Sequence, residues 1–254
     1  MTSDDLIARR AGSFGAHAAA YAEHRPDYPA AAVRWALAPL GGGPHRVLDL
    51  GAGTGKLTGV LLAEGHSTTA VEPDEGMLGE LVRRHGAARA LPGSAERIPV
   101  PDDTVDAVLV GQAFHWFDPA RALPEIARVL RPGGVLAALW NGDDESVPWF
   151  PGFNRAARSS VNEHDEPSGE WQPVPDHELF TDTTHGEFPH AQRHTAESLV
   201  ATINTHSHLL VIPPEEREAV NARMLAFLRS RPETAEGEFD LPLITRVVRM
   251  RSTR

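Results

Sequence analysis

The sequence predicts an α/β protein built on a doubly wound, mostly parallel sheet. From residue 45 to residue 140, short apolar runs alternate with helix-length amphipathic segments, and this alternation is typical of parallel βαβ units. The chain has 254 residues, of which 41% are hydrophobic, and this is enough for one large domain with a sizeable core. Sheets of this kind bind ligands beyond the carboxyl ends of their strands.

Two βα units open the predicted sheet. The runs "RVLDLG" (46–51) and "STTAVEP" (67–73) are short, apolar and ended by glycine or proline, as expected for strands. Between them, "GKLTGVLLAEG" (55–65) places apolar residues near helical spacing and stops at a glycine. After them, "DEGMLGELVRRHG" (74–86) begins with Asp74 as a helix N-cap and ends at a glycine.

The next segments continue the alternation. "ARALPG" (88–93) is a weak third strand, and "TVDAVLVGQAF" (104–114) is a fourth that is nearly all apolar, as a strand covered on both faces should be. An Asp-Pro pair then opens a helix over 118–130, because Asp caps the helix and Pro fits its first turn. "RPGG" (131–134) turns the chain into "VLAALWN" (135–141), a fifth buried strand.

The pattern is weaker after residue 141. Residues 142–190 are rich in Asp, Glu, Pro and His, and we expect mostly loop with short helices there. The stretches 196–210 and 214–230 have helical patterns. "LITRVVRMR" (243–251) alternates enough to predict a closing edge strand.

Composition and charge exclude several classes of protein. The formal net charge of −11 argues against a nucleic-acid binder, which needs a basic face to neutralise phosphates. No apolar run approaches the roughly 18 residues of a membrane span, and the start "MTSDDLIARR" lacks the apolar core of a signal peptide. We therefore expect a cytoplasmic protein, and its abundance of Ala, Arg, Gly and Pro indicates a bacterial source.

Neither cysteine chemistry nor a metal is expected. The chain has no cysteine, which excludes disulfides, thiolate zinc sites and a cysteine nucleophile. It has 13 histidines, and those at 190 and 194 or at 206 and 208 are closely spaced. None belongs to an H-E-x-x-H pattern, so we interpret them as surface histidines and predict no metal site.

A glycine-rich loop marks the predicted ligand edge. "DLGAGTGKLT" (49–58) places glycines at alternate positions between a strand and a helix, where they let the backbone approach a ligand closely. A dinucleotide fingerprint would need glycine in place of Lys56, and a phosphate-binding P-loop would need Ser or Thr in place of Leu57. The loop thus favours a nucleoside without pyrophosphate. Glu72, about 20 residues further on, can accept both ribose hydroxyl protons.

An aromatic cluster follows the fourth strand at the same edge. In "GQAFHWFD" (111–118), Phe114, His115, Trp116 and Phe117 are consecutive, although only 6% of the residues are aromatic. These side chains either line a pocket or pack the next helix against the sheet, and both alternatives are open. For His115 the alternatives are a role toward an acceptor hydroxyl and a backbone-bonded residue at the strand end.

Together these segments resemble the motifs of a known family. "VLDLGAGTGKLT", "AVEPDEGM", "GSAERIPVPDDTVDAVLVGQAFHWFD" and "EIARVLRPGGVLAALWN" are similar to successive motifs of class I S-adenosylmethionine-dependent methyltransferases. The subgroup with the greatest similarity is the small-molecule kind related to the UbiE and trans-aconitate methyltransferases, the type 11 group. The resemblance reaches upstream to "FGAHAAAYAEHRPDYP" (14–29) and weakens from about residue 142.

The resemblance implies a fold, a division of the chain and a reaction. It implies a seven-stranded Rossmann-like sheet with an N-terminal helical cap and C-terminal substrate-cap insertions. The expected parts are the helical cap (1–45), the cofactor-binding core (46–141), and the substrate-cap helices with closing strands (142–254). The reaction would be methyl transfer from S-adenosylmethionine to an oxygen, nitrogen or carbon of a small molecule, leaving S-adenosylhomocysteine.

The resemblance also assigns cofactor contacts. Gly51, Ala52 and Gly53 would contact the methionyl and ribose parts through backbone atoms. Asp49 would lie near the cofactor amino group, and Glu72 would hold the ribose hydroxyls. The family often has Asp where this chain has Ser94, so the adenine contact there departs from the pattern. The remaining implied contacts are Pro73, Met77, Ser94, Ala95 and Gln112.

The N-terminal stretch offers two further contacts. Tyr21, Arg25 and Tyr28 are spaced by four and three, which places them on one face of a helix if that stretch is helical. In the resembling family this helix lies over the cofactor, where Arg25 can pair with the methionyl carboxylate and Tyr21 can contact the cofactor. The alternative is an amphipathic helix with a solvated arginine and packed tyrosines.

For catalysis, the resemblance points to His115, Trp116 and Gln112. Aromatic faces attract a cationic sulfonium by about 0.5–2 kcal/mol when desolvated, and they exclude water from the reacting methyl. His115 can orient or deprotonate an acceptor hydroxyl. Because the leaving group is already activated, alignment for in-line displacement supplies most of the effect and no obligate base is expected.

Two other functions stay open from the sequence. An S-adenosylmethionine-binding protein can use the sulfonium for cyclisation or act as a regulator, since cofactor motifs report the cofactor and not its fate. An NAD(P)-dependent oxidoreductase shares the fold, but the residue at 56 and the aromatic loop argue against it. As partners we expect a small-molecule acceptor, no nucleic acid and no membrane, with the chain a monomer or homodimer.

Overall fold

The computed structural model describes residues 18–144, 146–161 and 174–254. Residues 1–17 of the predicted N-terminal cap and 162–173 of the predicted loop region lie outside the described residues. Contacts within the chain define two compact units. The sheet unit comprises Pro26–Gly142, Gln172–Pro189 and Ile244–Arg254, and the helical unit comprises Met1–Arg25, Asp143–Trp171 and His190–Leu243. The three functional parts expected from the sequence stay a prediction, and the compact units divide the chain differently.

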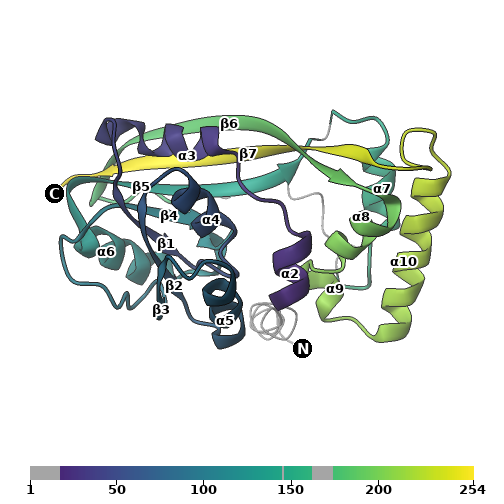
Figure 1. Cartoon of the computed structure of the whole chain (residues 1–254), viewed down its shortest axis with the longest axis horizontal. Coiled ribbons are helices and arrows are strands. Elements are labelled where there is room, and N and C mark those ends of the chain that lie inside the picture. Colours follow the sequence, from purple (N-terminus) through teal and green to yellow (C-terminus); the bar gives the residue numbers. More distant parts are fainter. Residues whose placement is uncertain (1–17, 145, 162–173) are drawn as a thin grey trace. The chain divides into compact units, whose positions relative to one another are not determined.

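A seven-stranded sheet has the order β3-β2-β1-β4-β5-β7-β6 (Figure 1). Its strands are β1 Arg46–Leu50, β2 Ser67–Glu72, β3 Arg89–Pro92, β4 Val105–Gly111, β5 Leu130–Asp143, β6 Phe180–His194 and β7 Phe239–Ser252. The pairs β1–β2, β1–β4, β2–β3 and β4–β5 are parallel. The strand order reverses between β1 and β4, so the ligand edge predicted for a doubly wound sheet lies at their carboxyl ends.

The last two strands run against this direction. Asp144 N–H donates to Pro242 O and Gly133 N–H donates to Arg254 O, so β5 and β7 are antiparallel. Arg249 of β7 donates to Thr184 of β6, and Arg246 of β7 donates to Glu187 of β6. The positions along β7 fall as those along β6 rise, so β6 and β7 are also antiparallel. The mostly parallel sheet predicted from the sequence is therefore confirmed.

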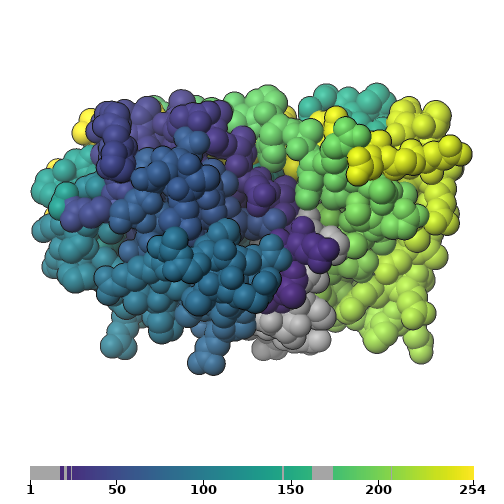
Figure 2. All heavy atoms as spheres, viewed as in Figure 1, coloured from purple at the N-terminus to yellow at the C-terminus, as the bar shows by residue number. Residues whose placement is uncertain are grey.

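In the sheet unit the helices are α3 Ala30–Leu37, η2 Ala38–Leu40, α4 Lys56–Ala63, α5 Glu75–Arg84, η3 Phe114–Trp116 and α6 Pro119–Val129. The two predicted caps are confirmed, because Asp74 accepts the Met77 N–H at 2.9 Å and Asp118 accepts the Ala120 N–H at 3.1 Å. The helices α4 and α5 lie side by side (Figure 2). A Cβ on Gly59 of α4 would come within 2.7 Å of the His85 ring that follows α5, so glycine permits this approach.

In the helical unit the helices are α2 Ala18–His24, α7 Phe150–Ala156, α8 Ala196–Ile203, α9 Ser207–Leu210 and α10 Pro214–Arg229. Its core brings Trp149, Phe150 and Phe153 together with aliphatic residues of α8 and α10. The single helix predicted over 196–210 is interrupted at residues 204–206 and forms α8 and α9. No helix of the described residues is both long and apolar enough to cross a bilayer.

Three predictions about the sheet were wrong. Residues 180–190, expected as loop, belong to β6, where exposed and half-buried positions alternate. The strand expected at the edge is β7, which lies between β5 and β6. The "RPGG" turn falls inside β5, where the register with β4 shifts and Gly133 has a φ of 73°.

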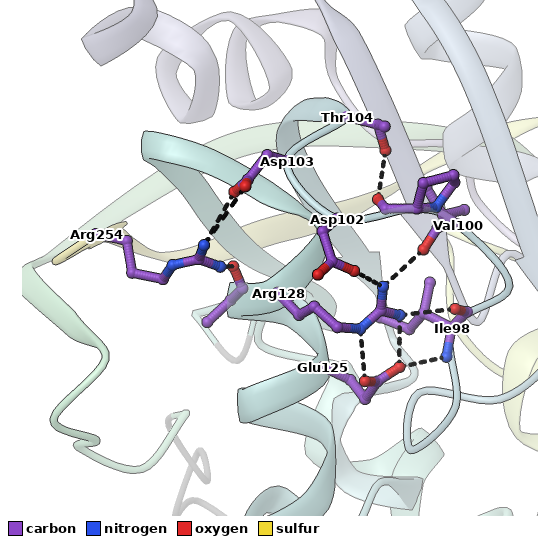
Figure 3. A network of polar contacts seen from close by, with 10 residues as sticks. Ile98, Val100, Asp102, Asp103, Thr104, Glu125, Arg128 and Arg254 are labelled. Carbon is purple, nitrogen blue, oxygen red and sulfur yellow. Dashed lines mark hydrogen bonds and ion pairs between the residues drawn. The ribbon is translucent and has the colours of Figure 1, made fainter.

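The link from β3 to β4 has no α-helix, and an arginine on α6 holds it in place (Figure 3). Arg128 donates to Val100 O and Ile98 O, both at 2.9 Å, and it pairs with Asp102 at 2.6 Å. Glu125 accepts from Arg128 and from the Ile98 N–H at 2.9 Å. Hydrogen bonds from Arg128 lower the pKa of Glu125, so this carboxylate stays charged.

Candidate functional site

The loop after β1 has backbone dihedrals that glycine adopts readily. Gly51, Gly53 and Gly55 have φ of 70°, 56° and 89°, a region that L side chains rarely occupy. A Cβ on Gly51 would lie 2.7 Å from the Ala113 Cβ, and one on Gly55 would lie 2.6 Å from the His85 ring. A Cβ on Gly53 would meet nothing within 4 Å. The loop is therefore packed at its ends and open at Gly53.

Glu72 closes this loop from the end of β2. It is 8% exposed, and it accepts the Gly53 N–H at 2.8 Å and the Asp74 N–H at 3.0 Å. Burial raises its pKa, against the effect of these hydrogen bonds. Each oxygen keeps a further lone pair, so Glu72 can accept hydroxyl protons from a ligand above the loop.

Asp49 lies beneath the loop and is fully buried. Its Oδ2 accepts the Thr58 hydroxyl at 2.6 Å, whereas its Oδ1 has no hydrogen-bond partner among the described residues. Burial, together with the nearby Glu72 carboxylate, raises the pKa of Asp49 to about 7, against the lowering effect of the hydrogen bond from Thr58. A buried acceptor without a partner destabilises the protein, so Asp49 is suited to a ligand that brings a cationic donor.

Gln112 connects the ends of β4 and β5. Its φ is 57°, one of the few positive values at a non-glycine residue of the described chain. Its backbone N–H donates to Leu139 O and its side-chain Nε2 donates to Asn141 O, both at 2.8 Å. Asn141 in turn donates to Asp27 O and accepts from the Thr245 hydroxyl. A strained backbone conformation held by its surroundings is common at functional sites.

The aromatic loop divides its four rings between two environments. Phe114 is 4% exposed and belongs to the core. The Phe117 ring is tilted against that of Phe114, at 5.5 Å between centroids, and a Cβ on Gly51 would lie 3.4 Å from it. His115 is exposed, and its ring centroid lies 4.6 Å from that of the half-buried Trp116. The loop thus has a part that packs in the core and a part that is exposed, and a pocket-lining role for the exposed part stays a prediction.

The turn after β3 completes this edge of the sheet unit. Ala95 and Met77 are buried, Ser94 is half-buried and Pro73 is exposed. Glu96 accepts the Asp118 N–H at 3.0 Å, which joins this turn to the start of α6. The structure therefore brings the predicted contacts from Asp49 to Gln112 to the carboxyl ends of neighbouring strands in one unit.

The N-terminal contacts are arranged differently from the sequence expectation. Tyr21 lies in α2, which ends at His24, and Arg25 donates to Thr205 O at 3.3 Å within the helical unit. Tyr28 lies beyond this helix, after Pro26, and is buried in the sheet unit. A Cβ on Gly111 would come within 2.7 Å of the Tyr28 hydroxyl, so this tyrosine packs against the end of β4.

Sequence reasoning missed two residues that shape this edge. Thr58 is fully buried and donates the hydrogen bond that holds Asp49. Lys56 pairs with Asp27 at 3.1 Å, which ties the first turn of α4 to the segment before α3. The i, i+9 spacing of Asp49 and Thr58 has no local signal, since only the strand–loop–helix turn brings them together. No group of three or more potential ligands in the described chain could hold a metal.

A doubly wound sheet with a glycine loop after β1 and a carboxylate at the end of β2 is typical of enzymes that bind a nucleoside cofactor. The family model described as "Methyltransferase domain" matches residues 48–138. The chain is 39% identical over 238 residues to an uncharacterized methyltransferase of Mycobacterium tuberculosis, covering 93% of this chain and 94% of that one. It is 33% identical over 239 residues to an uncharacterized methyltransferase of Schizosaccharomyces pombe, covering 92% and 94%.

A solved structure gives the same result. A candidate type II methyltransferase from Anaeromyxobacter dehalogenans matches with a TM-score of 0.61 and 26% identity, over 91% of this chain and 97% of that one. The chain therefore belongs to the class I S-adenosylmethionine-dependent methyltransferases. The predictions of the family, of the Rossmann-like fold and of a methyltransferase activity are confirmed.

Proposed function

We propose that this methyltransferase holds S-adenosylmethionine at the carboxyl ends of β1, β2 and β4 and methylates a small molecule. The observation that supports this most strongly is Asp49, whose buried Oδ1 has no partner among the described residues. Its raised pKa indicates that the carboxylate is unfavourable in the present surroundings. A primary ammonium such as that of the methionyl part would supply both the missing hydrogen bond and the opposite charge.

The other contacts follow from the loop geometry. The open side of Gly53 leaves room for a ligand beside backbone atoms of Gly51 and Ala52. Glu72 would accept ribose hydroxyls while it keeps the loop in place through the Gly53 N–H. Around the adenine we place Pro73, Met77, Ser94 and Ala95. Tyr21 and Arg25 remain proposed contacts from the N-terminal segment.

For the reaction, the bound cofactor supplies a methyl group on a positively charged sulfur. The protein's part is to align an acceptor atom with this methyl, and alignment alone can contribute up to about 7–11 kcal/mol. Gln112 is fixed at the strand ends by its bond to Asn141 O and would position the reacting groups. Trp116 would exclude water, and the exposed His115 beside it would orient or deprotonate an acceptor hydroxyl.

The acceptor is proposed to be a small molecule because of the charge. With a formal net charge of −11, the chain lacks the basic excess that nucleic-acid substrates require. Cytoplasmic location, a bacterial source and a monomeric or homodimeric state are further expectations from composition and family likeness. None of them affects the test of the cofactor site.

Calorimetry with S-adenosylmethionine and S-adenosylhomocysteine tests the cofactor site. Glu72→Gln removes the charge that accepts two backbone N–H groups and the ribose hydroxyls, and we expect binding to weaken by about tenfold or more. Glu178→Gln changes an exposed carboxylate before β6 and should leave binding unchanged. Equal affinities of the two variants would refute the placement.

Product analysis separates methyl transfer from the alternatives. Methyl transfer gives S-adenosylhomocysteine together with a methylated acceptor, whereas cyclisation gives methylthioadenosine. A binding protein gives neither product. If NAD binds and neither nucleoside does, the site is that of an oxidoreductase and the proposal fails.

A further inference from the structure

A cavity lies at the opposite edge of the same sheet. Its volume is about 440 Å³, and it is bordered by the amino ends of β1 to β4, whereas the glycine loop follows the carboxyl end of β1. Much of its lining is polar, and the polar side chains that matter here are Arg46, His66, Ser67, Thr69, Arg89 and Thr104. All of them belong to the sheet unit, and none takes part in the proposed methyl transfer.

The strand register assembles this polar surface. Arg46 lies opposite Ser67 in the β1–β2 pair, and Thr69 lies opposite Arg89 in the β2–β3 pair. Residues that are paired across parallel strands, or that are two apart along one strand, share a face. The two arginines therefore flank Ser67 and Thr69, with their Cα atoms about 10–12 Å apart from the standard strand spacings.

The amino ends of β1 to β3 lack a helical cover on the side of the β3–β4 link. The neighbouring Val47 also borders the cavity, and it packs with Leu61 of α4. Parallel sheets are normally covered on both faces, yet the β3–β4 link over residues 93–104 has no α-helix. Polar groups at the amino ends of β1 to β3 consequently border a cavity instead of a packed core.

The cavity carries a local excess of positive charge. Arg89 is exposed and has no ion pair among the described residues. Arg46 lies 3.6 Å from Asp106, but Arg131 shares the same carboxylate at 3.0 Å, so one negative charge serves two guanidinium groups. The Nη2 atom of Arg46, which is the atom that lies 3.6 Å from Asp106, is buried and makes no hydrogen bond in the described structure. This concentration of cations contrasts with the formal net charge of −11.

Uncharged donors accompany the arginines. His66 accepts the His45 N–H through Nδ1 at 3.2 Å, so in the neutral ring the proton is on Nε2, which is then a donor. The hydroxyls of Ser67 and Thr69 add two donors that can rotate toward a ligand. Guanidinium groups with hydroxyl and imidazole donors match the oxygens of phosphate or of several carboxylates.

We propose that this cavity binds a small, multiply charged oxyanion, a phosphate or a polycarboxylate, through Arg46 and Arg89. Ser67 and Thr69 donate between the two guanidinium groups. This ligand is distinct from the methyl-transfer cofactor, because the site lies at the other end of β1 and β2. Its binding stabilises the amino ends of three strands together.

Calorimetry and thermal unfolding with inorganic phosphate and with citrate test the site, in a buffer of low ionic strength. The wild type should bind one of the two anions with a stoichiometry near one. Arg89→Gln removes a charge-assisted donor, and we expect affinity to fall by about tenfold. Thr69→Val keeps the shape of the side chain and removes its hydroxyl, and we expect a smaller loss. Arg155→Gln changes the net charge equally at an exposed position of α7 and should bind like the wild type.

The outcomes identify the ligand or refute the site. Saturation by phosphate alone indicates a phosphorylated ligand, and saturation by citrate alone indicates a polycarboxylate. No saturable binding of either anion overturns the proposal, as does an equal loss in Arg89→Gln and Arg155→Gln. All variants should bind S-adenosylmethionine like the wild type, and a loss of cofactor binding in Arg89→Gln would show that the two edges of the sheet are not independent.

Discussion

At the scale of single residues, the glycine loop is constrained where it meets the aromatic loop. Gly51 has a φ of 70°, and a Cβ there would lie 2.7 Å from the Ala113 Cβ. Gly53 has a φ of 56° but open space around it. The two glycines therefore have different roles: the first is needed for packing, and the second, in the site that we propose, for access to the ligand.

Substitution of each glycine separates these reasons. Gly51→Ala should destabilise the protein by about 1–3 kcal/mol, because it combines left-handed strain with a clash. Gly53→Ala should lower stability by only about 1 kcal/mol while weakening cofactor binding. Urea unfolding and calorimetry measure the two effects. If both variants lose the same stability, the clash predicted at Gly51 is absent.

Asp49 predicts a proton linked to cofactor binding. Its pKa is raised to about 7, so near neutral pH a large part of the carboxyl population is protonated. A bound ammonium would favour the carboxylate and lower this pKa, so binding should release a proton and tighten as the pH rises toward 7 and above it. Calorimetry near pH 6.5 in two buffers of different ionisation enthalpy measures the release. Asp49→Asn should abolish it, and an unchanged release would point to another group.

The glycine loop and Glu72 could be predicted from the sequence because adjacent letters define them. Thr58 and Tyr28 could not, because their contacts with Asp49 and Gly111 depend on how the strand, loop and helix pack. The split of the aromatic loop between Phe114 and His115 also depends on a short 3₁₀ turn. The sequence shows which chemical groups are present, but it does not show what surrounds each side chain in the folded protein.

At the scale of elements, the β3–β4 link depends on one side chain. Arg128 of α6 binds Val100 O, Ile98 O and two carboxylates (Figure 3). A link without a helix has few backbone hydrogen bonds of its own, so a side chain supplies them. The predicted strands and caps around this link were confirmed, whereas this network had no signal in the sequence pattern.

Removal of the guanidinium should loosen this element. Arg128→Met is expected to lower stability by about 1–3 kcal/mol, since it leaves several partners without hydrogen bonds. Hydrogen exchange should increase in residues 98–104 before the sheet itself is affected. Arg121→Met alters an exposed position of the same helix and should change stability by less than about 0.5 kcal/mol. Similar exchange in both variants would show that the link is held by other contacts.

Elements with clear hydrophobic periodicity were predicted well from the sequence. Strand β6 lacks such periodicity and was not predicted. Its residues include Thr183, His185 and Glu187 on the exposed face, and half-buried polar residues on the other. Because both faces carry polar residues, no apolar alternation is visible. The strand is formed through its pairing with β7, which is a long-range effect that local pattern does not contain.

At the scale of the whole molecule, buried carboxyl groups predict how stability depends on pH. Folding raises the pKa of Asp49 from 3.8 to about 7. For a raised pKa, the stabilising contribution is complete below the unfolded value and is lost as the pH rises through the folded value. The cofactor-free protein should therefore become less stable from about pH 4 to pH 7 on account of this group, by at most about 4 kcal/mol.

Comparison with Asp49→Asn isolates this contribution. Glu72 also has a raised pKa, so the wild type alone cannot separate the two acids. Urea unfolding of both proteins across this pH range should show the variant gaining stability relative to the wild type as the pH rises. A difference that stays constant would mean that the carboxyl of Asp49 is not perturbed in the folded state.

The position of β7 has a consequence for the order in which the chain can fold. Strand β6 has β7 as its neighbour in the sheet, and β7 begins at Phe239, well after β6 has ended at His194. During synthesis, β6 must leave the ribosome with both of its edges unpaired, and it stays so while α8 to α10 emerge. Unpaired strand edges attract other chains. The nascent protein is therefore most prone to aggregate during this interval, when β1 to β5 can already pair and β6 cannot.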